Sequence, residues 1–313
     1  MKPILAFPIV LLFLLTLSAC TGGANPINTW IPAQASPTDL TPTKTRPAAS
    51  TTPIPSATST TQGSTPTPEA TASPTQPDCL AKGGKIVKGE LDTDLLLKPL
   101  EYRLYLPPCY FEERDRRYPV LYLIHGQSYN DDQWDRLGAD ETADDLIAEG
   151  EIAPFLIAMP RDRTWEQPTE DMFGEAVVEV LIPFIDQNYR TLPGRTYRAV
   201  GGLSRGAGWA VHLGLSHWEL FGAIGGLSPP IFHADTPKIR RWLDAIPPEG
   251  MPRIFLDIGD RDRPNILRSA LWFEDILTQK KIPHEWYLFS GYHEEAYWQA
   301  HLEQYLRWYA QNW

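Results

Sequence analysis

The chain of 313 residues has only three cysteines, Cys20, Cys79 and Cys109, and none of them stands at the Cys/His spacing of a zinc site. It also lacks a basic stripe or basic helix, and its net charge at pH 7 is −11. Because an acidic protein repels a phosphate backbone, we expect no nucleic-acid partner. Basic and acidic side chains cancel within residues 1–78, so the negative charge belongs to the remainder of the chain.

Aromatic residues are almost absent from residues 21–77, where Trp30 stands alone. Thr, Pro and Ser occupy 32 of these 57 positions. Such a stretch buries too little apolar surface to offset the entropy of ordering it. We therefore predict a disordered linker over residues 21–78, followed by one folded domain over 79–313, which is long enough for a sizeable core.

The apolar run from Ile4 to Leu17 is too short for a membrane-spanning helix, which needs about 20 residues. Its length suits a secretory signal peptide over residues 1–20. The run ends in Leu-Ser-Ala-Cys20, which resembles a bacterial lipobox and implies cleavage before Cys20 and lipidation of its thiol. We expect a lipid anchor in the cell envelope, on the extracytoplasmic face of a bacterial membrane. The alternative is an ordinary signal peptide with an incidental cysteine.

Cys79 and Cys109 would meet an oxidising compartment if the protein is exported. Cys79 begins the predicted domain, and Cys109 follows a predicted strand. A disulfide between them is one interpretation, and two unpaired buried thiols are the other.

Apolar runs typical of buried strands alternate with helical spacings along the domain. The first run also alternates with period two, as an early antiparallel or edge strand does. The pattern predicts an α/β fold, a doubly wound and mostly parallel sheet with helices on both faces. Functional side chains should then collect at the carboxyl ends of the strands. The expected strands cover 102–106, 119–124, 153–159, 197–203, 221–227, 253–258 and 284–289, and the expected helices 139–149, 175–189 with a kink at Pro183, 207–215, 265–280 and 294–311.

Ser204 stands in the sequence Gly202-Leu-Ser-Arg-Gly206, between a predicted strand and a predicted helix. A serine on so sharp a turn is lifted clear of the sheet, and the glycines relieve crowding around it. The following helix directs its N-terminal N–H groups at a developing oxyanion. We interpret Ser204 as a nucleophile, with a structural glycine turn as the alternative.

An oxyanion hole takes two backbone N–H donors, one after the nucleophile and one from an earlier loop. Arg205 supplies the first position, and Gln127, in the His125-Gly-Gln127 segment that ends a strand, supplies the second. We interpret His125 as a structural residue of this loop rather than as a base.

The candidate acid and base follow two later strands. Asp262 lies three residues after Gly259 and is our choice for the acid, with Asp260 next and Asp257, inside the strand, last. His293 precedes the final helix and is our choice for the base. The order Ser204, Asp262, His293 is that of α/β-hydrolases. Poorer candidates for the base are His212, His217, His233, His284 and His301.

Several segments together resemble the esterase family typified by esterase D, over about residues 98–312. This family includes S-formylglutathione hydrolases, feruloyl and acetyl-xylan esterases, enterochelin esterase-like enzymes and mycolyltransferases. The resemblance implies an α/β-hydrolase fold, a Ser204-His293-Asp262 triad, Gln127 and Arg205 as oxyanion donors, and no cofactor. Several relatives have Gly or Leu at the position of Gln127. The segments are Tyr105-Leu-Pro-Pro108, Tyr118–Gly126, Gly201–Gly206, Gly259–Asp262, and Gly291-Tyr-His293 with Tyr297-Trp298.

The substrate is less constrained than the chemistry. We expect an extracellular ester, small or linked to a polysaccharide, bound in a pocket near the active edge. Two other functions stay open: an acyltransferase with the same triad, and a non-catalytic carbohydrate-binding or adhesion module. The candidate pocket residues are Tyr129, Trp134, Arg161, Trp165 and His233.

Overall fold

The central strands bury side chains on both faces, as strands covered by two layers of helices do. We describe residues 77–313 from a computed structural model of the chain. In strand β3, Val120–Ile124, all five residues are buried. Val120, Tyr122 and Ile124 join the core on one face, and Leu121 and Leu123 join the core on the other. The period-two alternation of one apolar run thus builds both cores at once.

Eight strands of the described part form one sheet in the order β1-β2-β4-β3-β5-β6-β7-β8. The pairs β1–β2 and β2–β4 are antiparallel, and every other pair is parallel. The carboxyl ends of β3 to β8 therefore lie at one edge of the sheet. The other strands are β1 Lys85–Leu91, β2 Leu100–Leu106, β4 Leu156–Pro160, β5 Arg198–Leu203, β6 Ala223–Leu227, β7 Arg253–Gly259 and β8 Glu285–Phe289.

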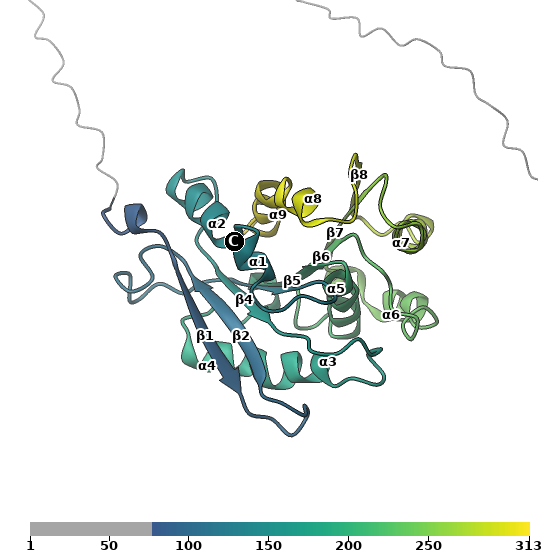
Figure 1. Cartoon of the computed structure of the whole chain (residues 1–313), viewed down its shortest axis with the longest axis horizontal. Coiled ribbons are helices and arrows are strands. Elements are labelled where there is room, and N and C mark those ends of the chain that lie inside the picture. Colours follow the sequence, from purple (N-terminus) through teal and green to yellow (C-terminus); the bar gives the residue numbers. More distant parts are fainter. Residues whose placement is uncertain (1–76) are drawn as a thin grey trace, which may run out of the picture. The chain divides into compact units, whose positions relative to one another are not determined.

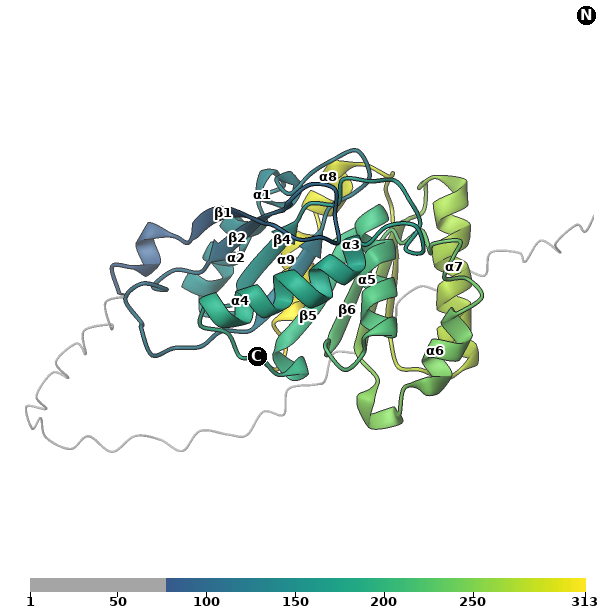
Figure 2. The ribbon, with the colours of Figure 1, turned by 90° about the horizontal axis from the view of Figure 1, so that it is seen from below.

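Helices cover both faces of the sheet (Figures 1 and 2). Side chains of α1, α2, α8 and α9 enter one core, and side chains of α3 to α7 enter the other. The fold is the predicted doubly wound α/β arrangement. The helices are α1 Gln133–Arg136, α2 Ala139–Ala148, α3 Phe173–Ala176, α4 Ile182–Asn188, α5 Arg205–Ser216, α6 Ile239–Ala245, α7 Pro264–Gln279, α8 Glu295–Gln299 and α9 Leu302–Tyr309.

Some elements differ from those predicted. The strand at 102–106, predicted to be antiparallel or at the edge, is antiparallel and lies inside the sheet, because β1, which we did not predict, pairs along its outer side. The helix predicted at 175–189 is divided by a π-helical turn, Val177–Leu181, so the break precedes Pro183. The final predicted helix is also divided, between α8 and α9.

The predicted signal peptide, Cys20 and nearly all of the predicted linker lie outside the described residues. Within residues 77–313, no helix combines the length and the apolar character that crossing a membrane requires.

Cys79 and Cys109 form a disulfide with a Cα–Cα distance of 5.0 Å. The bond joins the residues before β1 to the loop after β2. Of the two interpretations of these cysteines, the structure has the paired one. The disulfide closes a loop that contains the whole β1–β2 hairpin, and so it fixes the outer edge of the sheet.

Candidate active site

Ser204 occupies a sharp turn between β5 and α5. Its φ of 51° and ψ of −124° are rarely adopted by a residue with a side chain. The turn is tight: a Cβ on Gly202 would collide with the Gly206 backbone, and a Cβ on Gly206 would collide with the Ile124 carbonyl. Ser204 N–H donates to the Leu227 carbonyl oxygen at 2.8 Å, which ties the turn to the neighbouring strand. The glycines of the motif are therefore required by backbone contact.

His293 lies between Ser204 and Asp262. Its Nε2 is 2.8 Å from Ser204 Oγ, and its Nδ1 is 2.9 Å from the Asp262 carboxylate. The His293 side chain is 7% exposed and the Asp262 side chain is fully buried, so the bonds are largely shielded from water. The Trp298 ring stands edge-on to the imidazole at 4.9 Å and restricts its rotation. The structure thus brings together the three residues that the sequence singled out.

The loops after β7 and β8 are joined by backbone contacts that place Asp262 against His293. Asp260 N–H donates to the Phe289 carbonyl at 2.7 Å, and Arg261 N–H donates to the Gly291 carbonyl at 2.9 Å. A Cβ on Gly259 would collide with Gly291, so the close approach requires glycine there. The Asp260 carboxylate is directed to Gly291 N–H and does not contact the imidazole.

Asp257, the third candidate acid, is fully buried inside β7. Its Oδ2 accepts hydrogen bonds from Tyr297 at 3.0 Å and from Tyr305 at 2.6 Å. Burial raises the pKa of Asp257 to about 7 despite these bonds. Asp257 therefore links α8 and α9 to strand β7, and it does not contact His293.

The loop after β3 fixes the orientation of the peptide group between Gly126 and Gln127. The Gly126 carbonyl accepts from His125 Nδ1 at 2.7 Å and from Tyr129 N–H at 3.3 Å. In a trans peptide the N–H points opposite to the carbonyl, so Gln127 N–H is directed away from these two donors. Arg205 is the first residue of α5, so its N–H has no acceptor inside that helix. These are the two donors expected for an oxyanion hole.

Both nitrogens of His125 are engaged, so this residue is not available as a base. Its Nε2 accepts a hydrogen bond of 2.9 Å from Asp162 N–H, which leaves the proton on Nδ1 to donate to the Gly126 carbonyl. The ring is buried, and burial lowers the pKa of His125. A neutral imidazole therefore connects the loops after β3 and β4.

Asp162, which we did not predict as a site residue, connects the loop after β4 to the residues that follow β5. Its Oδ2 accepts from Arg205 Nε at 2.6 Å and from Trp209 Nε1 at 2.8 Å. The Arg205 guanidinium also lies 5.2 Å from the Phe232 ring centroid. Arg205 thus contributes its N–H to the candidate oxyanion hole and its side chain to a buried ion pair. The position of Asp162, at the carboxyl end of a predicted strand, could have marked it as a candidate.

The side chains of Gln133 and Trp134 form hydrogen bonds with the backbone at the end of β3 and in the loop after it. Gln133 Oε1 accepts from Gly126 N–H at 2.8 Å, and Trp134 Nε1 donates to the Ile124 carbonyl at 3.1 Å. Trp134, expected in the pocket, is instead 1% exposed and belongs to the core. The correction has a simple cause: its indole N–H needs an acceptor, and the strand end provides one.

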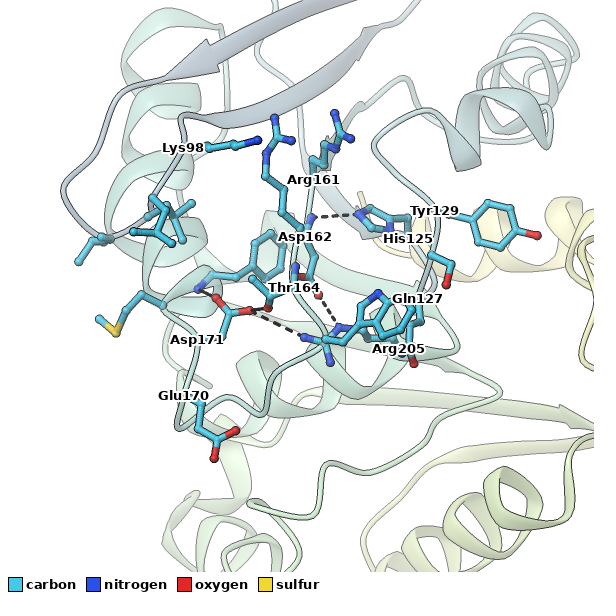
Figure 3. A pocket seen from close by; sticks show the side chains of 18 of the residues that line it. Lys98, His125, Gln127, Tyr129, Arg161, Asp162, Thr164, Glu170, Asp171 and Arg205 are labelled. Carbon is cyan, nitrogen blue, oxygen red and sulfur yellow. Dashed lines mark hydrogen bonds and ion pairs between the residues drawn. The ribbon is translucent and has the colours of Figure 1, made fainter.

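A cavity of about 570 Å³ lies next to the residues of the candidate oxyanion hole, and Ser204, Asp262 and His293 are not among the residues that line it (Figure 3). Gln127 and Arg205 line one part of it, together with Tyr129, Arg161 and Trp165, three of the residues that we expected in a pocket. His233 does not line it, because this exposed residue belongs to the segment between β6 and α6. The remaining walls come from Leu95–Pro99 in the β1–β2 hairpin and from the loop between β4 and α3.

The sequence matches the family described as "Putative esterase" over residues 96–309, which is more than half of the chain. The chain belongs to this family.

Among curated relatives of this esterase-family chain is an endo-1,4-beta-xylanase/feruloyl esterase of Xylanibacter ruminicola. The two are 31% identical over 179 residues, which is 54% of this chain and 24% of the relative. An uncharacterized protein of Corynebacterium glutamicum is 30% identical over 38% of this chain and 30% of its own length. The chain therefore matches only about a quarter to a third of the length of these curated relatives.

Solved structures establish the α/β-hydrolase fold for this member of the esterase family. A ferulic acid esterase superposes with a TM-score of 0.65 at 24% identity, over 73% of this chain and 98% of the other. An S-formylglutathione hydrolase of Staphylococcus aureus superposes with a TM-score of 0.57 at 15% identity, over 72% of this chain and 99% of the other. The fold class predicted from the sequence is confirmed.

No group of three or more His, Cys, Asp and Glu side chains is arranged to hold a metal ion in residues 77–313 of this esterase-family chain. The described side chains of the site are those of acid–base and nucleophilic chemistry: a hydroxyl, an imidazole and a carboxylate in sequence, with two backbone donors and a cavity beside them.

Proposed function

We propose that the protein is a serine carboxylic-ester hydrolase that acts through Ser204, His293 and Asp262. The observation that carries the proposal is the continuous series of hydrogen bonds from Ser204 Oγ through His293 to Asp262, on a strained turn at the carboxyl edge of the sheet. Membership of the esterase family supports the same reaction class.

In the first half of the reaction, His293 Nε2 removes the Ser204 hydroxyl proton while Oγ attacks the ester carbonyl carbon. Asp262 holds the Nδ1 proton and stabilises the imidazolium that forms. The carbonyl oxygen becomes an oxyanion held by the N–H groups of Gln127 and Arg205. His293 then returns the proton to the alkoxy oxygen, the ester C–O bond breaks, and the alcohol leaves an acyl-enzyme.

In the second half, a water molecule takes the place of the alcohol. His293 removes a proton from the water as its oxygen attacks the acyl carbon, and the same two N–H groups hold the second oxyanion. The proton passes to Ser204 Oγ when the acyl C–O bond breaks. The carboxylic acid leaves, and the hydroxyl of Ser204 is restored.

For the substrate we propose an extracellular ester, small or linked to a polysaccharide. The curated relative named as a feruloyl esterase and the ferulic acid esterase structures favour an ester with an aromatic part. Tyr129 and Trp165, both exposed and both lining the cavity, offer the faces on which such a part would stack.

The proposed place of action is the extracytoplasmic face of a membrane, with a lipid anchor on Cys20. The lipobox-like sequence before Cys20 supports this proposal. Full-length protein expressed in a bacterium with a fatty-acid analogue should carry the label, and Cys20→Ala should not. Unlabelled wild-type protein would contradict the anchor without affecting the esterase proposal.

The experiment for the reaction uses the full-length protein and a panel of short-acyl, feruloyl and acetyl-sugar esters. Ser204→Ala should abolish turnover and fluorophosphonate labelling while its thermal melt stays near that of wild type. Ser290→Ala changes an exposed serine of the loop that contains His293, removes only a hydrogen bond from Arg261, and should leave both unchanged. Turnover by Ser204→Ala equal to wild type would overturn the proposal. Product analysis with added sugar acceptors separates hydrolysis from acyl transfer.

A further inference from the structure

Three cationic side chains line the part of the cavity formed by the hairpin and the β4 loop: Lys98, Arg161 and Arg163. Lys98 is exposed, and its side chain extends toward Arg161 (Figure 3). Arg161 and Arg163 reach the same place from the loop after β4. Cations from two segments far apart in the sequence therefore meet at one wall.

One carboxylate, that of Glu101 on β2, pairs with both arginines of this wall. Arg161 bonds one of its oxygens, and Arg163 bonds the other. The two guanidinium groups lower the pKa of Glu101 in spite of its partial burial, so this carboxylate stays ionised. One negative charge is thus paired with two positive charges, and Lys98 adds a third positive charge to the wall.

The other acidic residues of the cavity do not neutralise the wall. Asp162 is engaged by Arg205 and Trp209. Asp171 accepts from Thr164 and from Phe173 N–H, on the side of the cavity near Arg205. The Glu170 carboxylate points away from Lys98 and Arg161 (Figure 3). The cations of the wall therefore keep donors available to a ligand.

The local excess of positive charge stands out in a chain whose net charge is −11. Such a protein repels anions at long range, so an anion is attracted only where cations gather within a Debye length of about 8 to 10 Å. Guanidinium groups also match carboxylate oxygens geometrically. Both arguments favour a carboxylate as the ligand of this wall.

We infer that Lys98, Arg161 and Arg163 form a specificity subsite for a carboxylate on the ester substrate. This inference rests on the proposed function, because the same cavity is lined by Gln127 and Arg205, beside which the reacting carbonyl would lie. An ester bound with its carbonyl at the oxyanion donors and a carboxylate at the cationic wall would extend along the cavity between them. The apolar side chains that line it, among them Leu96 and Trp165, contact the middle of the ligand.

The first experiment compares matched esters that differ only in one negative charge. On the acyl side, the pair is the mono-4-nitrophenyl ester of glutaric acid and 4-nitrophenyl pentanoate. On the alcohol side, the pair is 4-acetoxybenzoate and its methyl ester. The anionic member of one pair should have a kcat/KM about threefold to tenfold higher at low salt, and added salt should reduce that ratio. The pair that responds shows which part of the substrate carries the carboxylate.

Lys98→Gln and Arg163→Gln should each lower the ratio of anionic to neutral kcat/KM by about threefold or more, mainly through KM. Lys88→Gln is the matched control, because Lys88 is an exposed lysine of the same hairpin and does not line the cavity. It should leave the ratio and the basal activity unchanged. A ratio that both cavity variants leave at the wild-type value overturns the subsite.

Binding to Ser204→Ala separates the subsite from the proposed reaction. Calorimetry with the intact glutarate ester should give tighter binding than with the pentanoate ester, and Lys98→Gln in the same background should remove the difference. Equal binding of the two esters, together with equal binding of the two acetoxybenzoates, overturns the subsite even if wild-type protein hydrolyses all of them. Tighter binding of an anionic ester supports the subsite even if wild-type protein hydrolyses none, which would overturn only the proposed function.

Discussion

Arg205 Nε donates a hydrogen bond of 2.6 Å to Asp162 Oδ2, so the residue that follows Ser204 is tied to the loop after β4. The same aspartate donates its N–H to His125 Nε2. Three loops from three parallel strands, β3, β4 and β5, therefore share one connection. Arg205 is itself part of this connection, and Gln127 lies two residues after His125. We therefore expect the positions of both candidate oxyanion donors to depend on the connection.

Removing only Arg205 from the Arg205–Asp162 ion pair should lower the free energy of unfolding more than removing both charges. Arg205→Met leaves the Asp162 charge buried without its cation, which costs about 3–5 kcal/mol in the free energy of unfolding. Arg205→Met combined with Asp162→Asn removes both charges and should recover part of that loss. Urea unfolding of the two variants and of Asp162→Asn alone measures the coupling. A double variant less stable than Arg205→Met would contradict this account.

Substitution of Asp262 and of Asp260, two aspartates of the loop after β7, should show which of them is the acid of the proposed triad. Asp262→Asn should lower kcat by about 10³- to 10⁴-fold, because an amide cannot stabilise the imidazolium and favours the wrong tautomer. Asp260→Asn removes a carboxylate that bonds Gly291 N–H and Arg261 and should change kcat by less than about tenfold. Steady-state kinetics on the best ester of the panel makes the comparison. Equal losses in the two variants would remove Asp262 from the proposed triad.

Asp257 should make the protein less stable as pH rises from about 4 to about 7. Its pKa is raised to about 7 in the folded state, so the unfolded chain releases the proton at lower pH than the folded chain. The stabilisation is fully present below the unfolded pKa and is lost as pH rises through the folded value, by at most about 4 kcal/mol. Asp257→Asn cannot titrate, so wild type should lose stability relative to this variant between pH 4 and 8. Parallel pH profiles of the two unfolding free energies would refute the prediction.

The disulfide should stabilise the folded domain by restricting the unfolded chain. Cys79 and Cys109 are separated by 30 residues, for which loop closure is worth about 3–4 kcal/mol. Changing both cysteines to alanine should lower the thermal midpoint by several degrees. A reducing agent should lower the midpoint of wild type and not that of the double variant. A midpoint unchanged in the double variant would show that the bond contributes little.

Short motifs at strand ends allowed much of the site to be predicted. Ser204 could be located because only a glycine-flanked turn permits its backbone angles. Asp262 and His293 could be located because each follows a buried strand, and parallel strands place their carboxyl ends together.

Side-chain direction was less predictable than position. Trp134 and Tyr129 both follow β3, yet one enters the core and the other remains exposed. The difference depends on an acceptor for the indole N–H, which a sequence does not display. The pairing of Arg205 with Asp162 was missed for a related reason: it joins loops 43 residues apart, and no periodicity connects them. The outer strand β1 was missed because its charged residues hide its apolar alternation.

The two halves of the sheet contribute different parts of the site. Ser204, Asp262 and His293 follow strands β5, β7 and β8, whereas β1 to β4 and their loops build most of the cavity wall. The halves meet where Ile124 of β3 pairs with Gly202 of β5. Exchange of the hairpin and the β4 loop between homologues could therefore give new selectivity in evolution while the reacting groups are inherited intact.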